Sequence, residues 1–183
     1  MILEIVKYGD PVLRAKGVAV RADDAKIRAL AEDMLETMRD ADGVGLAAQQ
    51  VGVAVQLTVI DVSDVEDRPS TMKVAGQPVK LEEWMPLVLL NPQLELGREK
   101  ESGTEGCLSF PDLTGEISRS AAVKARALLL DGSEFEFEAT GLLARALQHE
   151  VDHLNGVLFI DRMNSATKAT LASRLKRMQK EMR

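Results

Sequence analysis

The chain of 183 residues has one cysteine, two histidines and few aromatic side chains, which make up 3% of its residues. A single cysteine cannot form an internal disulfide, so the sequence is typical of a reducing compartment and leaves one thiol free. No apolar run approaches the roughly 20 residues of a membrane span, and residues 1–7 lack the long apolar region of a signal peptide. We therefore expect a cytoplasmic protein that does not cross a membrane.

The composition is typical of a folded domain, with 45% hydrophobic and 28% charged residues and no low-complexity tract. A chain of this length can bury a core without metals or disulfides. No internal repeat or interdomain linker interrupts it. We expect one domain over residues 1–183.

The charge is distributed unevenly. The net charge is -6, but residues 162–183 contain seven basic residues and one acidic residue, so this tail is +6 and the rest of the chain is -12. The basic residues are Arg162, Lys168, Arg174, Lys176, Arg177, Lys180 and Arg183. A helix from about residue 165 to 182 would carry most of them, with Leu171, Leu175, Met178 and Met182 along one side. Two interpretations remain open: a contact to an anionic partner, or a solvated helix face.

Two further helices are predicted from apolar periodicity. The first follows a cap at Asp23 or Asp24 and has an apolar stripe at Ile27, Leu30, Ala31, Met34, Leu35 and Met38. The second runs over residues 141–155, capped by Thr140 and stopped by Gly156. Its apolar stripe is Leu143, Leu147, Val151 and Leu154.

Aliphatic runs predict strands at residues 56–62 and 87–90. Alternation predicts a hairpin of residues 122–128 and 134–139 around the turn Asp131-Gly132. Residues 63–86 are polar and long for a plain connection. Within them, residues 74–79 can form the tip of another hairpin.

The residues that can act as nitrogen or sulfur metal ligands are His149, His153 and Cys107. On a helix, His149 and His153 stand one turn apart on one face, so both imidazoles can reach one metal. Glu150 projects beside them, within range of a metal-bound water. A metal at this position would lower the pKa of water and polarise a carbonyl, and Glu150 could transfer the proton to a leaving amine. Amide hydrolysis is the reaction class that this pattern predicts.

The third ligand is open to alternatives at this point. Cys107 is the economical choice, because a thiolate binds tightly and Gly106 leaves room for close approach. Taken alone, however, Cys107 could be a small buried hydrophobic residue. A distant glutamate could be the ligand instead, as in metalloproteases with two histidines and one glutamate. A catalytic cysteine paired with one histidine is a further alternative, but it leaves the second histidine unexplained.

Three segments together resemble the peptide deformylase family: GVGLAAQQ at residues 43–50, EGCLS at 105–109 and QHEVDH at 148–153. The resemblance runs from the turn at residues 8–11 to beyond Gly156. It implies hydrolysis of the N-terminal formyl group from formylmethionine of newly synthesised polypeptides, with release of formate. It also favours an enzyme over a ribosome-associated protein that keeps the fold without activity, because Glu150 and Gln50 are both present.

The resemblance also implies roles for individual residues. Cys107, His149 and His153 match the metal ligands, and Glu150 matches the general acid and base. Gln50 and the backbone N-H of Leu108 match the groups that stabilise the oxyanion. Positions around the methionine pocket and the peptide-binding backbone are matched by Val44, Gly45, Leu142 and Ala146.

The family's fold is α+β, with mostly antiparallel sheets around a central helix that carries the histidine motif, and a C-terminal helix. Its members commonly use Fe(II), and isolated proteins also accept zinc, nickel or cobalt. In some bacterial members the C-terminal helix contacts the ribosome. The basic tail of this chain is thus expected to bind ribosomal RNA electrostatically, without reading nucleic-acid sequence.

This chain departs from many relatives at two positions. Seven residues after the cysteine, Thr114 replaces an arginine that helps to hold the peptide. Either Arg119 substitutes for it or the peptide is held less tightly. Arg145 stands where some relatives have an aliphatic residue, so we expect a more polar rim of the methionine pocket. Residues 63–86 also look longer than in compact members.

Overall fold

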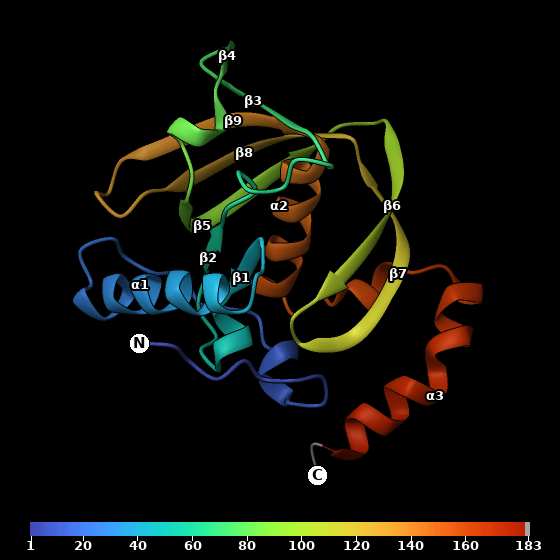
Figure 1. Cartoon of the computed structure of the whole chain (residues 1–183). Coiled ribbons are helices and arrows are strands. Elements are labelled where there is room, and N and C mark those ends of the chain that lie inside the picture. Colours follow the sequence, from blue (N-terminus) through green and yellow to red (C-terminus); the bar gives the residue numbers. More distant parts are fainter. Residues whose placement is uncertain (182–183) are drawn as a thin grey trace.

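The computed structural model describes residues 1–181 and arranges them in the order shown in Figure 1. The α-helices are α1 (Ala25–Asp40), α2 (Gly141–Leu154) and α3 (Ser165–Glu181). The strands are β1 (Gly45–Ala47), β2 (Leu57–Ile60), β3 (Ser70–Val74), β4 (Gln77–Val79), β5 (Leu87–Leu96), β6 (Lys100–Cys107), β7 (Phe110–Ser120), β8 (Ala122–Leu128) and β9 (Glu134–Thr140). Over these residues, no helix is long and apolar enough to span a membrane.

Most strands belong to one sheet with the order β1-β2-β5-β8-β9-β3-β4, in which all neighbours are antiparallel. Strands β6 and β7 form a separate antiparallel hairpin that arches away from the sheet (Figure 1). Helix α2 lies between the two, and its Leu143 and Leu147 are fully buried against the large sheet. The predicted α+β class, with antiparallel strands around a central helix, is confirmed.

Helix α1 begins and packs as its sequence predicts. The side chain of its N-cap residue Asp24 accepts a hydrogen bond from the N-H of Lys26 at 2.9 Å. The apolar stripe is buried at Ala31, Met34 and Met38, and it packs on strands β1 and β2. The helix covers one edge of the large sheet.

The cap of helix α2 differs from the prediction. Thr140 occupies the N-cap position, but its side chain makes no capping hydrogen bond. Instead, the hydroxyl of Ser70, at the start of β3, accepts from the N-H of Leu143 at 2.8 Å, and the carbonyl of Pro69 accepts from Leu142 at 3.2 Å. The C-terminal end agrees with the prediction, because the helix ends at Leu154 and Gly156 follows with φ +76°.

The polar stretch of residues 63–86 therefore has a structural role. The predicted hairpin tip is present as strands β3 and β4, joined by a turn at Ala75 and Gly76. Strand β3 also pairs with β9 and so extends the large sheet. The strands on either side differ in length from the predicted ones. Strand β2 is shorter than the predicted range 56–62, and β5 extends beyond the predicted range 87–90 to Leu96.

The hairpin of β6 and β7 was not predicted as strands. Most side chains of β6 are polar and exposed, and β7 contains Pro111 and Gly115. Neither segment therefore shows the alternation or aliphatic run by which strands are recognised. Phe110, Leu113 and Ile117 of β7 are nevertheless buried, in a second core beneath the hairpin.

Helix α3 packs on this second core through a narrow stripe. Leu175 is buried, and Leu171 and Met178 are partly buried against the same cluster. The stripe thus docks on the body of the protein. Met182 and Arg183, which belong to the predicted stripe and the basic tail, lie outside the described residues.

Candidate active site

The two histidines stand on one face of helix α2. His149 and His153 are one helical turn apart, and their ring centroids are 5.0 Å apart with an interplanar angle of 63°. Helix periodicity accounts for this arrangement, because residues at i and i+4 project from the same side. His153 is 1% exposed, so its ring lies in the interior.

Cys107 reaches the histidines from a different element. It is the last residue of β6, where the register of the β6–β7 hairpin shifts between Gly106 and Cys107. Such an irregularity re-aims a side chain relative to a regular strand. The Sγ atom of Cys107 lies 3.3 Å from Nε2 of His153.

Cys107, His149 and His153 form a donor group that fits one metal ion. One ligand atom from each residue lies within 4.8 Å of the others. Two ligands of one tetrahedral ion at about 2.0–2.3 Å are about 3.3–3.6 Å apart, so metal binding would draw the more distant of these atoms closer together. It is the one such group of histidine, cysteine and carboxylate side chains found among residues 1–181. In this candidate group, the side chain that lies beside the two histidines is therefore a thiol and not a carboxylate from elsewhere in residues 1–181.

Glu105 orients His149 from behind. Its Oε1 lies 2.9 Å from Nδ1 of His149, which leaves Nε2 of that ring to face the site. Burial opposes ionisation of Glu105, but its hydrogen bonds with Arg119 and His149 hold the pKa of this carboxyl below its ordinary value. Carboxylates commonly bind the outer nitrogen of metal-ligating histidines in this way.

Glu150 is buried beside the histidines. Its side chain is 3% exposed, and Oε1 has no hydrogen-bond partner among the described residues. Burial is the main cause that raises the pKa of Glu150 to about 7. Gly45 makes room for it, because a Cβ at that position would lie 2.5 Å from Oε2 of Glu150. A carboxyl that titrates near neutrality suits a group that takes up and returns a proton.

Gln50 directs its amide NH₂ group into the site. Its Oε1 accepts a hydrogen bond from the backbone N-H of Ala47 at 3.0 Å. This bond orients the amide, so Nε2 points to Sγ of Cys107 at 3.5 Å and to Oγ of Ser109 at 3.2 Å. Gln50 is 1% exposed. The side chain is a fixed donor beside the candidate metal ligands.

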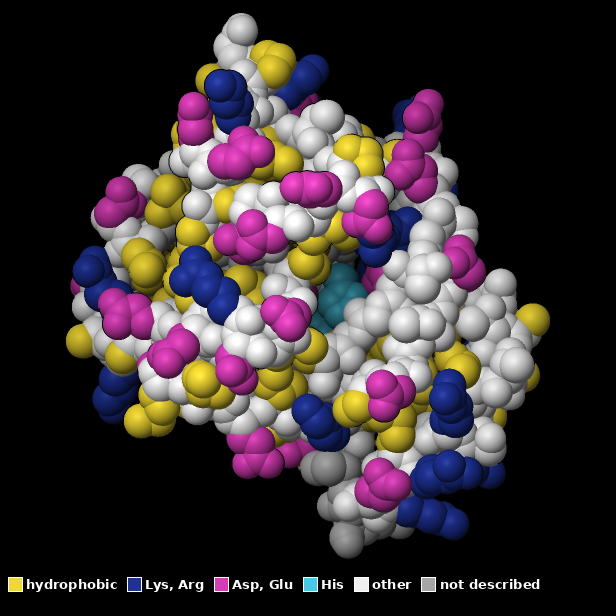
Figure 2. Space-filling model, in the orientation of Figure 1, with side chains coloured by type: hydrophobic (Ala, Val, Ile, Leu, Met, Phe, Trp, Pro, Cys, Tyr) yellow, Lys and Arg dark blue, Asp and Glu magenta, His cyan; other side chains and the backbone are white. Residues whose placement is uncertain are grey.

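One pocket of about 560 Å³ brings these groups together. Figure 2 shows a patch of histidine surface in a hollow between the hairpin and the rest of the molecule. The pocket is lined by all of the sequence-predicted site residues except the more deeply buried His153: Val44, Gly45, Gln50, Cys107, Leu108, Leu142, Arg145, Ala146, His149 and Glu150. Thr114 also lines it.

The two arginines named in the sequence both bind Glu105. Arg119 does not substitute for the arginine missing at Thr114: its side chain is 4% exposed and bound to Glu105 and Asp152. Arg145 lines the pocket, and its guanidinium pairs with Glu105 at 2.7 Å. The cations that line the pocket and lie nearer to solvent are Lys7 and Arg68, which sequence reasoning did not identify.

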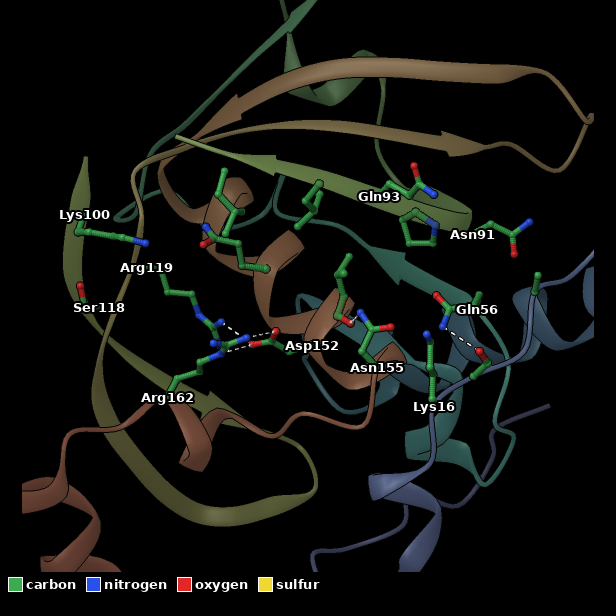
Figure 3. A pocket seen from close by; sticks show the side chains of 17 residues that line it. Lys16, Gln56, Asn91, Gln93, Lys100, Ser118, Arg119, Asp152, Asn155 and Arg162 are labelled. Atoms are coloured by element: carbon green, nitrogen blue, oxygen red, sulfur yellow. Dashed lines mark hydrogen bonds and ion pairs between the residues drawn. The ribbon is translucent and has the colours of Figure 1, made fainter. Parts of the chain in front are cut away.

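Arg119 belongs to a chain of ion pairs that runs behind the site. Asp152 accepts from Arg119 at 2.7 Å and, with both oxygens, from Arg162 at 2.9 and 3.1 Å. Figure 3 shows this group at the wall of another cavity, of about 650 Å³. That cavity contains none of the candidate metal ligands among its lining residues. These contacts join residues 33 and 10 positions apart, so no local motif indicated them.

Comparisons with known proteins agree with this site. A family model described as polypeptide deformylase matches residues 2–169. The chain is 46% identical over 180 residues to a peptide deformylase from Methylacidiphilum infernorum, covering 98% of this chain and 94% of that protein. It is 48% identical over 158 residues to one from Clostridium botulinum, covering 86% and 94%.

Solved structures give the same result. The crystal structure of a peptide deformylase from Thermotoga maritima has a TM-score of 0.76 and 39% identity, covering 90% of this chain and 99% of that one. A peptide deformylase from Thermus thermophilus has a TM-score of 0.81 and 37% identity, covering 99% of both chains. The likeness therefore extends over nearly the whole fold.

Proposed function

Because this chain belongs to the polypeptide deformylase family, we propose that it is a metal-dependent hydrolase that removes the formyl group from the formylmethionine of newly synthesised polypeptides. The observation that carries the proposal is the single pocket that joins Glu150 and Gln50 to Cys107 and His149. Water and the formamide give formate and a free amino group. An enzyme that acts on chains leaving the ribosome would work in the cytoplasm.

Cys107, His149 and His153 would hold one divalent metal ion. We propose Fe(II) as this ion, with zinc, nickel or cobalt as replacements in isolated protein, because one thiolate with two imidazoles suits several of these metals. When bound, the ion would polarise the formyl carbonyl and lower the pKa of water. Glu105 supports this arrangement because it fixes the ring of His149.

Glu150 would move the proton. In this proposal its carboxylate takes a proton from the attacking water and delivers it to the nitrogen that leaves with the peptide. Its burial next to Gly45 keeps bulk water from competing for that proton. Gln50 Nε2 and the backbone N-H of Leu108 would donate to the oxygen that gains negative charge in the transition state.

The apolar part of the pocket would receive the methionine side chain. Leu142 and Ala146 lie on the face of helix α2 that lines the pocket, and Val44 lines it from the segment before β1. In this proposal the N-H of Val44 and the backbone of Gly45 would also bind an extended peptide, because the carbonyl of Val44 already accepts from the N-H of Asp61 at 2.8 Å. The guanidinium of Arg145 is bound to Glu105 and to the carbonyls of Ile117 and Glu101, so these groups, and not the methionine side chain, are its partners.

The deciding experiment is release of formate from formyl-Met-Ala-Ser by protein purified without oxygen. We expect turnover with Fe(II), and also after loading with nickel or cobalt. Absence of formate with all of these metals would refute deformylation. Two alternatives would then remain, a metalloprotease and an inactive ribosome-associated protein. A metalloprotease would cleave unformylated peptides, whereas an inactive protein would not.

Helix α3 supports a second proposal, that the protein associates with the ribosome. Lys168, Arg174, Lys176, Arg177 and Lys180 are exposed, whereas Leu175 fixes the helix to the body. Figure 2 shows basic side chains over this part of the surface. An exposed basic helix can bind phosphates of RNA without reading the base sequence.

The contact can be tested by replacing Arg174, Lys176, Arg177 and Lys180 with alanine. We expect weaker cosedimentation with ribosomes, and a weaker salt dependence of that binding, because fewer counterions are released. Turnover of formyl-Met-Ala-Ser should not change. Equal ribosome binding by the variant and the parent would make this surface an ordinary solvated helix face.

A further inference from the structure

The candidate metal site is assembled from two separate parts of the fold. Cys107 belongs to the β6–β7 hairpin, whereas His149 and His153 belong to helix α2. The hairpin is not part of the large sheet. The distance between the thiol and the imidazoles therefore depends on how the hairpin is held against the helix.

A polar stripe on helix α2 makes this connection. Arg145, Gln148 and Asp152 follow i, i+3, i+7 spacing and thus share one side of the helix. Gln148 accepts from the N-H of Ser120 at 3.0 Å and donates to its carbonyl at 2.9 Å. Asp152 binds Arg119 of β7 at 2.7 Å. Both contacts lie toward the C-terminal end of β7.

Within residues 1–181, Arg145 is the residue of this stripe that binds both strands of the hairpin. Its Nη1 donates to the carbonyl of Ile117 in β7 at 2.9 Å, and its Nη2 donates to the carbonyl of Glu101 in β6 at 2.9 Å. Nη1 also binds Oε2 of Glu105 at 2.7 Å. One buried guanidinium thus joins two backbone carbonyls and a carboxylate.

The hairpin is shaped to receive this group. A Cβ at Gly103, in β6, would lie 3.1 Å from both Cζ and Nη2 of Arg145. The guanidinium therefore rests directly on the backbone of β6. Arg145 is 8% exposed and Glu105 5%, so water competes little for these bonds.

We infer that Arg145 is a positioning residue for the metal site. It holds the hairpin, with Cys107, at a fixed distance from helix α2, and it holds Glu105 against His149. This inference rests on the proposed metal-dependent function. A planar guanidinium is needed, because a lysine ammonium cannot present donors in several fixed directions at once.

Cobalt(II) provides a readout that does not depend on activity. The protein is stripped of metal and titrated with cobalt(II) chloride against a chelator, and the sulfur-to-cobalt charge-transfer band reports the geometry at Cys107. For Arg145→Met we expect roughly 10- to 100-fold weaker binding, the usual range when an outer partner of a ligand is lost. The charge-transfer band should shift, and amide hydrogen exchange over residues 100–107 should become faster.

Two variants serve as comparisons. Arg145→Lys keeps the positive charge but loses the planar set of N-H donors. We therefore expect its affinity for cobalt to stay close to that of Arg145→Met. Arg126→Met removes an exposed arginine whose nearest carboxylate, Glu136, is 3.9 Å away; it should bind cobalt like the parent. A Lys variant that matches the parent would show that only charge matters and would overturn the positioning role.

Gly103→Ala tests the same contact without removing a charge. The added methyl would press on the guanidinium, and we expect a smaller loss of affinity in the same direction. If Arg145→Met does not fold, the cobalt affinities of Gly103→Ala and Arg145→Lys test the inference in its place. Parent-like affinity and spectrum in the folded Arg145 and Gly103 variants would refute the inference. If the parent protein itself binds no cobalt, the proposed metal-dependent function fails instead.

Discussion

The hydroxyl of Ser70 caps the helix that carries both histidines, because it accepts a hydrogen bond from the backbone N-H of Leu143 at 2.8 Å. Ser70 and Leu143 are 73 residues apart in the chain. The start of β3 thus sets where helix α2 begins and where its histidines stand.

Replacing Ser70 with alanine should lower the free energy of unfolding by about 1 kcal/mol, since a helix N-terminal N-H loses its acceptor. Urea denaturation measures this loss. Thr140→Ala is the control, because Thr140 occupies the N-cap position without making a capping bond. Its hydroxyl is bound to that of Thr71 at an exposed position, so Thr71→Ala is measured alongside to account for the loss of this contact. A larger loss for Thr140→Ala than for Ser70→Ala would mean that the local residue is the effective cap.

The difference between these two residues shows what local sequence could predict. The helix, its apolar stripe and its glycine stop follow from residues within a few positions of one another, so they were predicted. The cap comes from a strand brought alongside by pairing of β3 with β9. A propensity for threonine at the N-cap indicates a helix start, but it does not identify the atom that accepts the bond.

The candidate site likewise combines features that local sequence predicts with contacts that only the tertiary fold creates. The pairing of His149 with His153 and the position of Glu150 follow from helix periodicity alone. Cys107 was favoured as the third ligand by its donor chemistry, but only the resemblance chose it over a distant carboxylate, because nothing in residues 105–109 predicts a strand that ends beside the helix. The contacts of Glu105 with Arg119 and Arg145 span 14 and 40 residues. They depend on the hairpin, whose polar strands were not predicted, so the buried carboxylate behind His149 could not be assigned.

Cys107 and Glu150 should fail in different ways when replaced. Cys107→Ser should lose tight metal binding and activity, because a thiolate is lost from the donor set. Glu150→Ala should keep the metal, and its turnover should fall by at least roughly 10²- to 10⁴-fold, because proton transfer is lost. Metal content and formate release measured on the same samples separate the two. Loss of metal from the Glu150 variant would instead identify Glu150 as a ligand.

The neighbouring glutamines offer a matched pair. Gln50→Ala should reduce kcat by roughly 10²- to 10³-fold with little change in KM, as when one oxyanion donor is removed. Gln49 is equally buried, but its Nε2 donates to the carbonyls of Ala15 and Leu154 at 3.2 Å. Gln49→Ala should therefore lower stability and leave kcat of the folded protein nearly unchanged. Equal kcat losses in both variants would argue against a specific role for Gln50.

Arg68 should help to hold the peptide in place of an arginine at Thr114. It lines the pocket, is exposed, and makes no hydrogen bond or ion pair among residues 1–181. An exposed ionic contact contributes up to about 1 kcal/mol. Arg68→Ala should thus raise KM for formyl-Met-Ala-Ser about two- to fivefold, with a smaller effect when the C-terminal carboxylate is amidated. The same change in KM for Arg126→Ala would show that only overall charge matters.

The ion pair of Arg14 with Asp161 should make stability depend on pH. Partial burial opposes ionisation of Asp161, but the hydrogen bond from Arg14 prevails and lowers the pKa of this carboxyl. A carboxyl with a lowered pKa in the folded state stabilises the protein above its ordinary pKa, and this stabilisation is lost as the pH falls through the folded-state value. Asp161→Asn should therefore unfold at lower urea concentration than the parent at pH 7, and the difference between the two midpoints should shrink as the pH is lowered from 5 toward 3. Equal midpoints for the two proteins at pH 7 would mean that Asp161 acts only through its hydrogen bond with the N-H of Leu158, which an asparagine can also accept. A difference that stays constant between pH 5 and 3 would contradict a role for the ionised carboxylate.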